Sequence, residues 1–464
     1  MPGVELGDLG MKMAYNATCN GYGRFSGVRV PRGSLLAAHA EVDGDGMYRV
    51  VDSGGENLAK KLYATMLDMR CIIVRGAGMG LAQTVTVATR YSVVREQGRP
   101  MFAAEDSAEV SLVAYKSQQY RLGMLIAQAY AVVFASKAFD AEYRQFEAER
   151  AVGDYARLGF IHGLSTGLKA WATTVASAGA EEARKMCGGH GYLAISGLPD
   201  MVATVAATAT FEGDNYVMWQ QLVRYLFKQI KTQPVDADIA EYMGGLTAYL
   251  EKDGGRWSLE GGVCELATLQ SIFRHRSMRL LALAFEVLSK ESETSSPGEA
   301  WNKHMMSVLS AGHAFVEYYV LRTFAEYVDG VRDTDSNLAA TLRRLCRLFA
   351  LTTVVSPVST FYAVSFTEDG TLNVAHLTQM RETINELLLQ LLPDLVALTD
   401  AWDFTDASLS SALGCKDGNV YERLMVWTKQ LPVNNGSLVA EAWGGDEGVG
   451  GFLRRNNNIR QSKV

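Results

Sequence analysis

The segment from Met186 to Tyr192 has the composition of a ligand-binding turn. It reads Met-Cys-Gly-Gly-His-Gly-Tyr and lies between two apolar stretches with helical periodicity. Glycine lacks a Cβ atom and adopts positive φ angles, so the backbone amides of Gly188 and Gly189 can face a flat or anionic ligand. A helix end followed by a turn has the same composition, and this segment alone favours that structural interpretation.

A second segment, Phe211-Glu212-Gly213-Asp214-Asn215, places a carboxylate at the start of a helix. Glu212 follows the uncharged run 201–211, and the apolar residues beyond Asn215 have helical spacing. A carboxylate fixed in this way can serve as a general base. A glutamate near a helix N-terminus also stabilises the helix dipole, and alone this segment favours that role.

Long helices must position both segments. Apolar residues recur every three or four positions from Glu56 onward, and breaks fall at 98–100, 151–153 and 188–197. The sequence predicts helices at 56–97, 106–148, 152–186 and 200–230, which would form an antiparallel four-helix bundle. A second helical set is predicted at 258–290, 299–330, 336–355 and 376–400.

The predicted fold class is mainly α, with a remnant of a β domain at the start. Glycines and short apolar clusters predict strands and turns in residues 1–52, a partial β domain. Residues 53–233 form the predicted bundle that carries Glu212, and residues 250–435 form a second, C-terminal helical domain. Residues 436–464 are rich in Gly and Asn and are predicted to be a flexible tail.

Two other patterns imitate ligand sites. In Gly76-Ala77-Gly78-Met79-Gly80 the third glycine comes one residue too early for a dinucleotide-binding loop, and the preceding residues have helical spacing. We therefore predict glycines that allow close helix packing. Asp43-Gly44-Asp45-Gly46 lacks the later glutamate of a calcium loop and predicts a turn. No metal site is predicted.

Composition excludes several classes of protein. The 464 residues carry a net charge of −7 without a basic stripe, which argues against a nucleic-acid partner. Six dispersed cysteines without a C-x-x-C pair argue against a disulfide-stapled secreted scaffold. The longest uncharged run, 348–367, contains several hydroxyl residues and a proline, so we predict a buried helix and turn and no membrane span.

The two glycine-containing segments, taken together and in order, closely resemble the acyl-CoA oxidase family. Ser196-Gly197-Leu198-Pro199 lies between them, as in that family. The resemblance covers nearly the whole chain. It continues in Gly7–Gly10, Asn20-Gly21, Val28–Arg32, Thr89–Arg95, His313, Asp400–Phe404 and Asp417–Glu422.

The resemblance implies a flavoenzyme of fatty-acid β-oxidation. Such oxidases convert an acyl-CoA to the trans-2-enoyl-CoA and pass electrons from FAD to molecular oxygen, which yields hydrogen peroxide. Glu212 matches the family's catalytic base, and its backbone amide matches a donor to the thioester oxygen. The helical bundle would be the C-terminal domain of an acyl-CoA dehydrogenase-like fold.

The resemblance also implies a homodimer, because family FAD sites lie across a two-fold interface. Arg95 matches an arginine that reaches the pyrophosphate, and Gln118 or Gln119 matches a glutamine on the next helix. The remaining implied FAD-binding residues are Gly188, Gly189 and Asn215.

The match begins inside the family's β domain. The sequence therefore suggests a fragment of a longer protein or a degenerate paralogue, and we expect this chain alone to hold FAD weakly. Two other functions remain open at this stage: a catalytically silent dimer partner, and an acyl-CoA dehydrogenase. The ending Ser462-Lys463-Val464 resembles a peroxisomal import signal, which suggests a peroxisome or related organelle.

Overall fold

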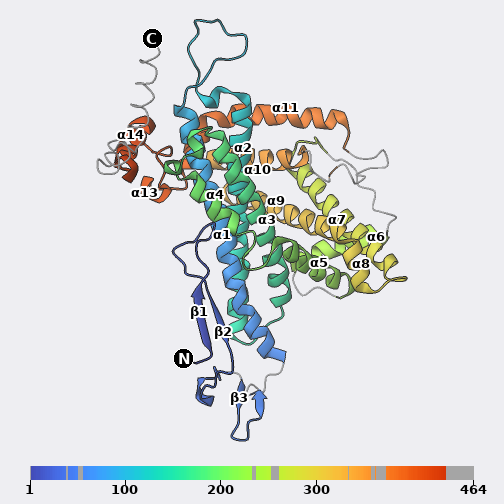
Figure 1. Cartoon of the computed structure of the whole chain (residues 1–464). Helices are drawn as coiled ribbons and strands as arrows, with labels where there is room; N and C mark the ends of the chain where they lie inside the picture. Colours follow the sequence, from blue (N-terminus) through green and yellow to red (C-terminus); the bar gives the residue numbers. More distant parts are fainter. Residues whose placement is uncertain are drawn as a thin grey trace, which may run out of the picture.

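A computed structural model describes residues 2–37, 40–50, 56–232, 237–251, 261–332, 334–356, 361 and 372–434. The N-terminal part contains two small antiparallel sheets, as the sequence predicted for this region. The first pairs β1 (Val4–Asp8) with β2 (Gly21–Phe25), and the second pairs β3 (Ala40–Val42) with β4 (Tyr48–Val50). Both sheets extend from one end of the helical body (Figure 1).

The turn between β3 and β4 is the Asp-Gly-Asp-Gly segment. The Asp43 Oδ1 atom accepts hydrogen bonds from the amides of Asp45, at 3.0 Å, and Met47, at 2.9 Å. The carboxylate therefore stabilises a tight hairpin, and the prediction of a turn is confirmed.

Three long helices form the centre of the molecule. They are α1 (Glu56–Val94), α2 (Lys116–Ala151) and α3 (Leu158–Met186), and each packs against the other two. The short helix α4 (Leu198–Ala207) packs on α1 and α3, and α5 (Asn215–Lys231) packs on α3. The predicted bundle is therefore formed mainly by α1–α3 and α5.

The glycines in the middle of α1 allow close helix contacts. An added Cβ at Gly80 would lie 2.6 Å from Cγ2 of Val205, and one at Gly78 would lie 3.0 Å from methyl groups of Val132 and Val133. This segment is helical throughout. The prediction of helix-packing glycines is confirmed for Gly78 and Gly80, whereas an added Cβ at Gly76 would meet nothing within 4 Å.

A second helical set covers one side of these helices. It comprises α6 (Ala237–Glu251), α7 (Leu266–Glu291), α8 (Pro297–Lys303), α9 (Met305–Arg332), α10 (Ser336–Val354) and α11 (Val374–Leu391). Because α9 and α10 pack directly on α2, the buried apolar residues of both sets form one continuous core.

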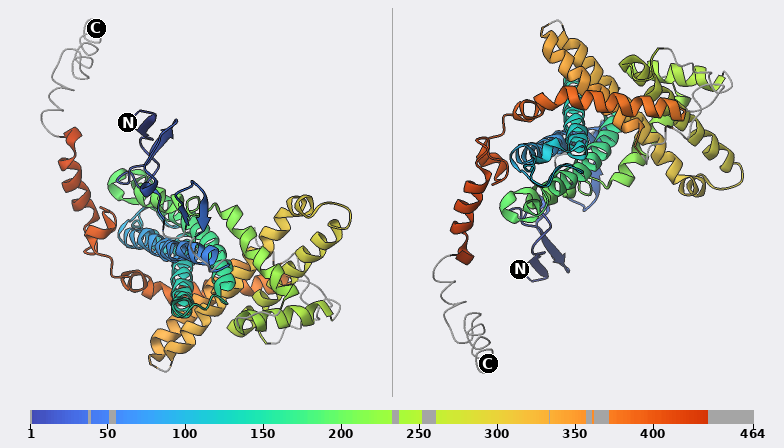
Figure 2. Two further views of the ribbon diagram at one scale, coloured as in Figure 1. Left: turned by 90° about the horizontal axis from the view of Figure 1, so that it is seen from below. Right: turned by 90° about the horizontal axis from the view of Figure 1, so that it is seen from above.

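The C-terminal helices lie on the opposite side of α1–α3 from α6–α8, as both views in Figure 2 show. They are α12 (Leu395–Asp400), α13 (Asp406–Leu409) and α14 (Val420–Gln430). The division into domains at 1–52, 53–233, 250–435 and 436–464 stays a prediction, and the last of these ranges lies outside the described residues.

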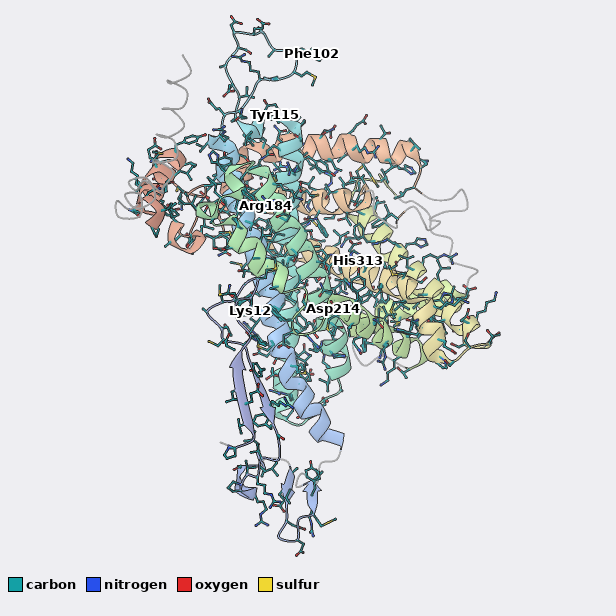
Figure 3. The ribbon with its side chains drawn as sticks, in the orientation of Figure 1. Lys12, Phe102, Tyr115, Arg184, Asp214 and His313 are labelled. Carbon is teal, nitrogen blue, oxygen red and sulfur yellow. The ribbon has the colours of Figure 1, made fainter. Side chains whose placement is uncertain are left out.

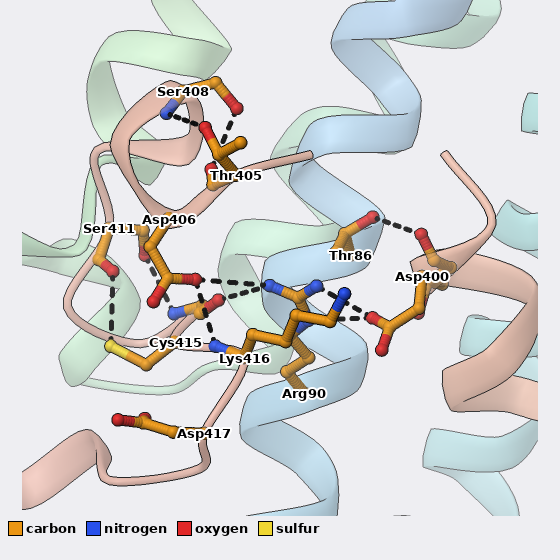
Figure 4. Close-up of polar contacts among 12 residues, drawn as sticks. Thr86, Arg90, Asp400, Thr405, Asp406, Ser408, Ser411, Cys415, Lys416 and Asp417 are labelled. Carbon is orange, nitrogen blue, oxygen red and sulfur yellow. Dashed lines mark hydrogen bonds and ion pairs between the residues drawn. The ribbon is translucent and has the colours of Figure 1, made fainter. Parts of the chain in front are cut away.

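Arg90 fastens the C-terminal segment to α1. Its guanidinium donates to the Asp400 carboxylate at 2.8 and 3.0 Å and to the Gly414 carbonyl at 2.7 Å (Figure 4). Asp406 lies 3.7 Å from the same guanidinium. One buried cation therefore holds three parts of the C-terminal segment.

The predicted fold class, mainly helical with a small β portion, is confirmed. Several predicted helix limits are wrong. The helix predicted at 106–148 begins at Lys116, and the one predicted at 152–186 begins at Leu158 after a left-handed Gly153. The helix predicted at 200–230 is interrupted between α4 and α5, and α6 lies in a region predicted as a break between domains.

Two helices are long and apolar enough to cross a membrane by length and composition alone. One is the Met66–Val94 part of α1, and the other is the whole of α2. Of the most apolar 18-residue stretch in each, 67% is buried inside the molecule in α1 and 78% in α2. Burial of this extent is typical of the core helices of a soluble protein.

Candidate active site and cofactor-binding face

The ends of three helices meet at the glycine-rich segment. The hydroxyl of Tyr91, near the end of α1, lies 2.6 Å from Nδ1 of His190. Gln118, in the first turn of α2, donates to Ser92 Oγ at 2.8 Å and to the Met186 carbonyl at 3.1 Å. These contacts fix the end of α3 against α1 and α2.

Gly188 and Gly189 expose their backbone at this junction. Gly188 has φ of +57°, and a Cβ added to either residue would meet nothing within 4 Å. Both residues are exposed. The open backbone leaves room for a ligand to approach closely. We call the surface formed by Arg95, Gly188 and Gly189 the clamp face.

Arg95 extends from the end of α1 at the same junction. It donates to the hydroxyl of Tyr421, on α14, at 2.9 Å, and it also bonds the Gln97 side chain. The side chain remains partly exposed. A guanidinium held in this way can bind a phosphate group through the donors it still presents.

The two glutamines of α2 differ in their surroundings. Gln118 uses its amide group inside the protein, as described above. Gln119 donates to the Val113 carbonyl at 3.0 Å, while its Oε1 atom is buried and accepts no hydrogen bond from the described part of the chain. Both side chains are 6% exposed, so neither extends into solvent as the guanidinium of Arg95 does.

Glu212 lies on the loop 208–214 between α4 and α5. Its φ of +55° places it in the left-handed region, and Gly213 follows at +106°. The Asp214 carboxylate then accepts from the Tyr216 amide at 2.9 Å and caps α5. The carboxylate of Glu212 is partly exposed and accepts no hydrogen bond from the residues that the structure describes. It is therefore available to a substrate.

Asn215, the first residue of α5, is bonded inside the helical bundle. Its amide donates to the Ala170 carbonyl at 3.1 Å and to the hydroxyls of Thr173 and Thr174 at 2.9 and 3.0 Å. Its Oδ1 atom accepts from Lys169 Nζ at 3.0 Å. In this arrangement Asn215 anchors the Glu212 loop to α3.

The Glu212 loop and the clamp face lie at different levels of α3. Asn215 bonds Thr173 in the middle of α3, whereas Gly188 lies two residues beyond Met186, where α3 ends. The part of α3 from Thr173 to Met186 is roughly 20 Å long at 1.5 Å per residue. Figure 3 shows this separation through Asp214, the last residue of the loop, and Arg184, near the glycines. A single chain therefore does not bring Glu212 together with Arg95 and the two glycines.

A cavity of about 610 Å³ lies behind the Glu212 loop. Asp214 and Asn215 line one side, and His313, Glu317 and Arg276 line another. Arg276 and Glu317 form a buried ion pair at 2.5 Å, and His313 lies 3.4 Å from the same carboxylate. Burial alone would raise the pKa of Glu317, but these two groups hold it well below its usual range.

Comparisons with known proteins find one family that matches both the sequence and the fold of this chain. Residues 63–227 match the family model "Acyl-CoA oxidase, C-alpha1 domain", and residues 265–444 match "Acyl-CoA oxidase". The structure of Arabidopsis thaliana acyl-CoA oxidase 1 superposes with a TM-score of 0.84 at 30% identity, over 98% of this chain and 67% of that chain. The chain belongs to the acyl-CoA oxidase family.

Other acyl-CoA oxidases are also similar to this chain in sequence and structure. Rattus norvegicus peroxisomal acyl-coenzyme A oxidase 1 is 34% identical over 94% of this chain and 64% of its own length. Acyl-CoA oxidase-1 of Caenorhabditis elegans, solved in complex with FAD and ATP, is 31% identical with a TM-score of 0.79, over 94% of this chain and 63% of that chain. This chain thus spans about two thirds of the length of its relatives.

Within this chain, the structure places Arg95, Gly188 and Gly189 at the junction where α1, α2 and α3 meet, and it places Glu212 and Asn215 elsewhere. Gln118 and Gln119 lie behind the clamp face. The roles predicted for all seven residues in catalysis or FAD binding stay predictions. Among the described residues, no group of three or more His, Cys, Asp or Glu side chains is arranged to hold a metal ion.

The sequence did not point to two residues near these sites, Tyr421 and Lys169. Tyr421 lies in a quoted motif, but nothing in the sequence pairs it with Arg95. Lys169 is the only Asp, Glu, Lys or Arg between Arg157 and Glu181. A single lysine in the stretch 158–180, which has no other Asp, Glu, Lys or Arg, was the available signal for a buried polar contact.

Proposed function

We propose that this protein is an FAD-dependent acyl-CoA oxidase that works as a homodimer. It desaturates a fatty acyl-CoA to the trans-2-enoyl-CoA and reduces molecular oxygen to hydrogen peroxide. The curated relatives are named peroxisomal oxidases, which supports a peroxisomal location. The Ser462-Lys463-Val464 ending lies outside the described residues.

The observation that carries this proposal is the conformation of the Glu212 loop. The carboxylate of Glu212, which accepts no hydrogen bond from the described residues, stands on a non-helical loop that hydrogen bonds of Asn215 and Asp214 anchor to α3 and α5. Such a group can take a proton from a substrate, because it is fixed in place and its lone pairs are free. The family membership supports an acyl-CoA as the substrate.

The proposed chemistry assigns two tasks to Glu212. Its carboxylate removes the proton from the α-carbon of the thioester. Its backbone amide donates a hydrogen bond to the thioester oxygen, on which negative charge develops as the proton leaves. When bound, FAD accepts the hydride from the β-carbon and passes the electrons to oxygen.

The clamp face fits the phosphate portion of FAD. Arg95 presents a guanidinium, and Gly188 and Gly189 present open backbone. Because this face lies roughly 20 Å along α3 from Glu212, we propose that it binds the cofactor of the partner subunit, while Glu212 acts beside the cofactor of its own subunit. Gln118 supports the face from behind by fixing Met186.

The test is a product balance in air, performed on protein purified from the cells that make it. With FAD and a long-chain acyl-CoA, we expect equal amounts of enoyl-CoA and hydrogen peroxide. Enoyl-CoA that forms only with an added electron acceptor would indicate a dehydrogenase. A colourless protein with neither product would indicate a silent dimer partner. Either result would contradict the proposal.

A further inference from the structure

The conformation of the Glu212 loop must be held by its surroundings. A residue with a Cβ atom is sterically disfavoured in the left-handed region, so a glutamate with φ of +55° persists only where neighbouring contacts fix it. The side chain of Glu212 does not supply these contacts, since it accepts no hydrogen bond from the described residues.

Lys169 supplies them from α3. Its ammonium donates to the carbonyls of Ala209, at 3.2 Å, and Gly213, at 2.6 Å, and to Asn215 Oδ1 at 3.0 Å. Ala209 and Gly213 lie on either side of Glu212. One ammonium, with its three N–H donors all in use, therefore ties both ends of the loop to the helix.

Burial and the neighbouring charged groups act in opposite directions on the pKa of Lys169. The side chain is fully buried, and this desolvation is the main reason why its pKa falls from 10.5 to about 8. Asp214 and Glu212, on the loop, favour the ammonium, and Arg70, on α1, opposes it. At pH 7 the group remains charged and keeps all three donors.

We propose that Lys169 is a positioning residue for catalysis, which holds the Glu212 loop in its left-handed conformation by bonding the carbonyls on both sides of Glu212. The proposal rests on the proposed role of Glu212 in proton removal. Lys169 touches neither the substrate nor the cofactor in this scheme, and it acts through the loop.

The test replaces Lys169 with methionine, which has a similar length but no donors. In Lys169→Met, hydrogen–deuterium exchange of a peptide covering 208–217 should be at least about tenfold faster, while peptides from α7 and α10 keep the parent rate. The kcat for acyl-CoA oxidation should fall about a hundredfold with KM little changed, because a misplaced base slows proton transfer without weakening substrate binding.

Lys228→Met is the matched control, because Lys228 is an exposed lysine on α5. Loop exchange and kcat that both stay within about twofold of the parent in Lys169→Met would overturn the proposal, and so would a loosened loop with unchanged kcat. If neither the parent nor the variant oxidises acyl-CoA, the proposed function fails, while the exchange experiment still decides whether Lys169 holds the loop.

If Lys169→Met raises hydrogen–deuterium exchange throughout the chain, the Lys169→Arg variant provides the test. Arginine keeps the charge, so we expect loop protection and part of kcat to recover. A restored fold with an unprotected loop would overturn the proposal.

The pH dependence gives an independent measurement. Above about pH 8 a neutral amine retains two donors for three acceptors. The kcat of the parent should therefore fall on the alkaline side with a midpoint near pH 8, and Lys169→Arg, whose guanidinium stays protonated, should lack that fall. The same alkaline limb in both proteins would overturn the proposal.

Discussion

Arg90 binds Asp400 through two hydrogen bonds of 2.8 and 3.0 Å across 310 residues of sequence. The pair joins the end of α1, which carries Arg95, to the C-terminal segment, which carries Tyr421. The geometry of the clamp face therefore depends on a contact that lies outside it.

Replacing Arg90 should destabilise the protein strongly. Its side chain is 6% exposed, and Arg90→Met would leave the Asp400 carboxylate and the Gly414 carbonyl without their donor. We expect a loss of about 3 kcal/mol in the free energy of unfolding, measured by urea titration. The exposed pair of Arg75 with Asp140 provides the control, and Arg75→Met should cost less than about 1 kcal/mol. Equal losses in the two variants would contradict this assignment.

Alanine should have opposite effects at two glycines of α1. A Cβ at Gly80 meets the stiff side chain of Val205 at 2.6 Å, whereas one at Gly76 meets nothing within 4 Å. We expect Gly80→Ala to destabilise by about 1–3 kcal/mol and Gly76→Ala to stabilise by up to about 1 kcal/mol. Adding Val205→Ala to Gly80→Ala should recover part of the loss. Thermal unfolding of the four proteins checks this, and the absence of recovery would exclude Val205 as the cause.

Removing Arg95 should weaken FAD retention. A charge-assisted hydrogen bond to phosphate contributes about 1.5–3 kcal/mol, so the Kd for FAD in Arg95→Ala should rise about ten- to a hundredfold. Flavin fluorescence titration measures it. Arg144→Ala, at an exposed position on α2, is the control and should keep the parent Kd. An unchanged Kd in Arg95→Ala would exclude the clamp face from cofactor binding.

The cysteines should behave as six free thiols of which one is accessible. Cys19 is exposed, and the other five are buried. Burial raises the pKa of Cys71 and of Cys187 to about 12, which suppresses the reactive thiolate. At pH 7, a thiol reagent should label one thiol per folded chain promptly and six after unfolding in urea. Prompt labelling of two or more in the folded protein would contradict the described burial.

The sequence was sufficient for the helical fold and for the nature of the glycine segment in α1, because both depend on local spacing. It was insufficient for the break between α4 and α5. The run 201–211 has helical character, and the chain leaves the helix where the contacts of Lys169 with Ala209 and Gly213 replace helical hydrogen bonds. Such a long-range contact leaves no local pattern.

The same limit applies to the candidate site. Motif order predicted Glu212 as a base and Arg95 with the two glycines as cofactor contacts, but sequence spacing does not show that α4 runs back along α3 and separates Glu212 from the others. The burial of Gln118 and Asn215 likewise depends on partners from other helices.

The most direct test of the account replaces Glu212 with glutamine in protein purified from the cells that make it, supplied with FAD and a long-chain acyl-CoA. The amide nearly matches the carboxylate in shape but cannot accept the α-proton. Enoyl-CoA and peroxide formation should therefore fall at least about a hundredfold, while FAD content and thermal stability stay at parent values. Turnover within about threefold of the parent would contradict the assignment of Glu212 as the catalytic base.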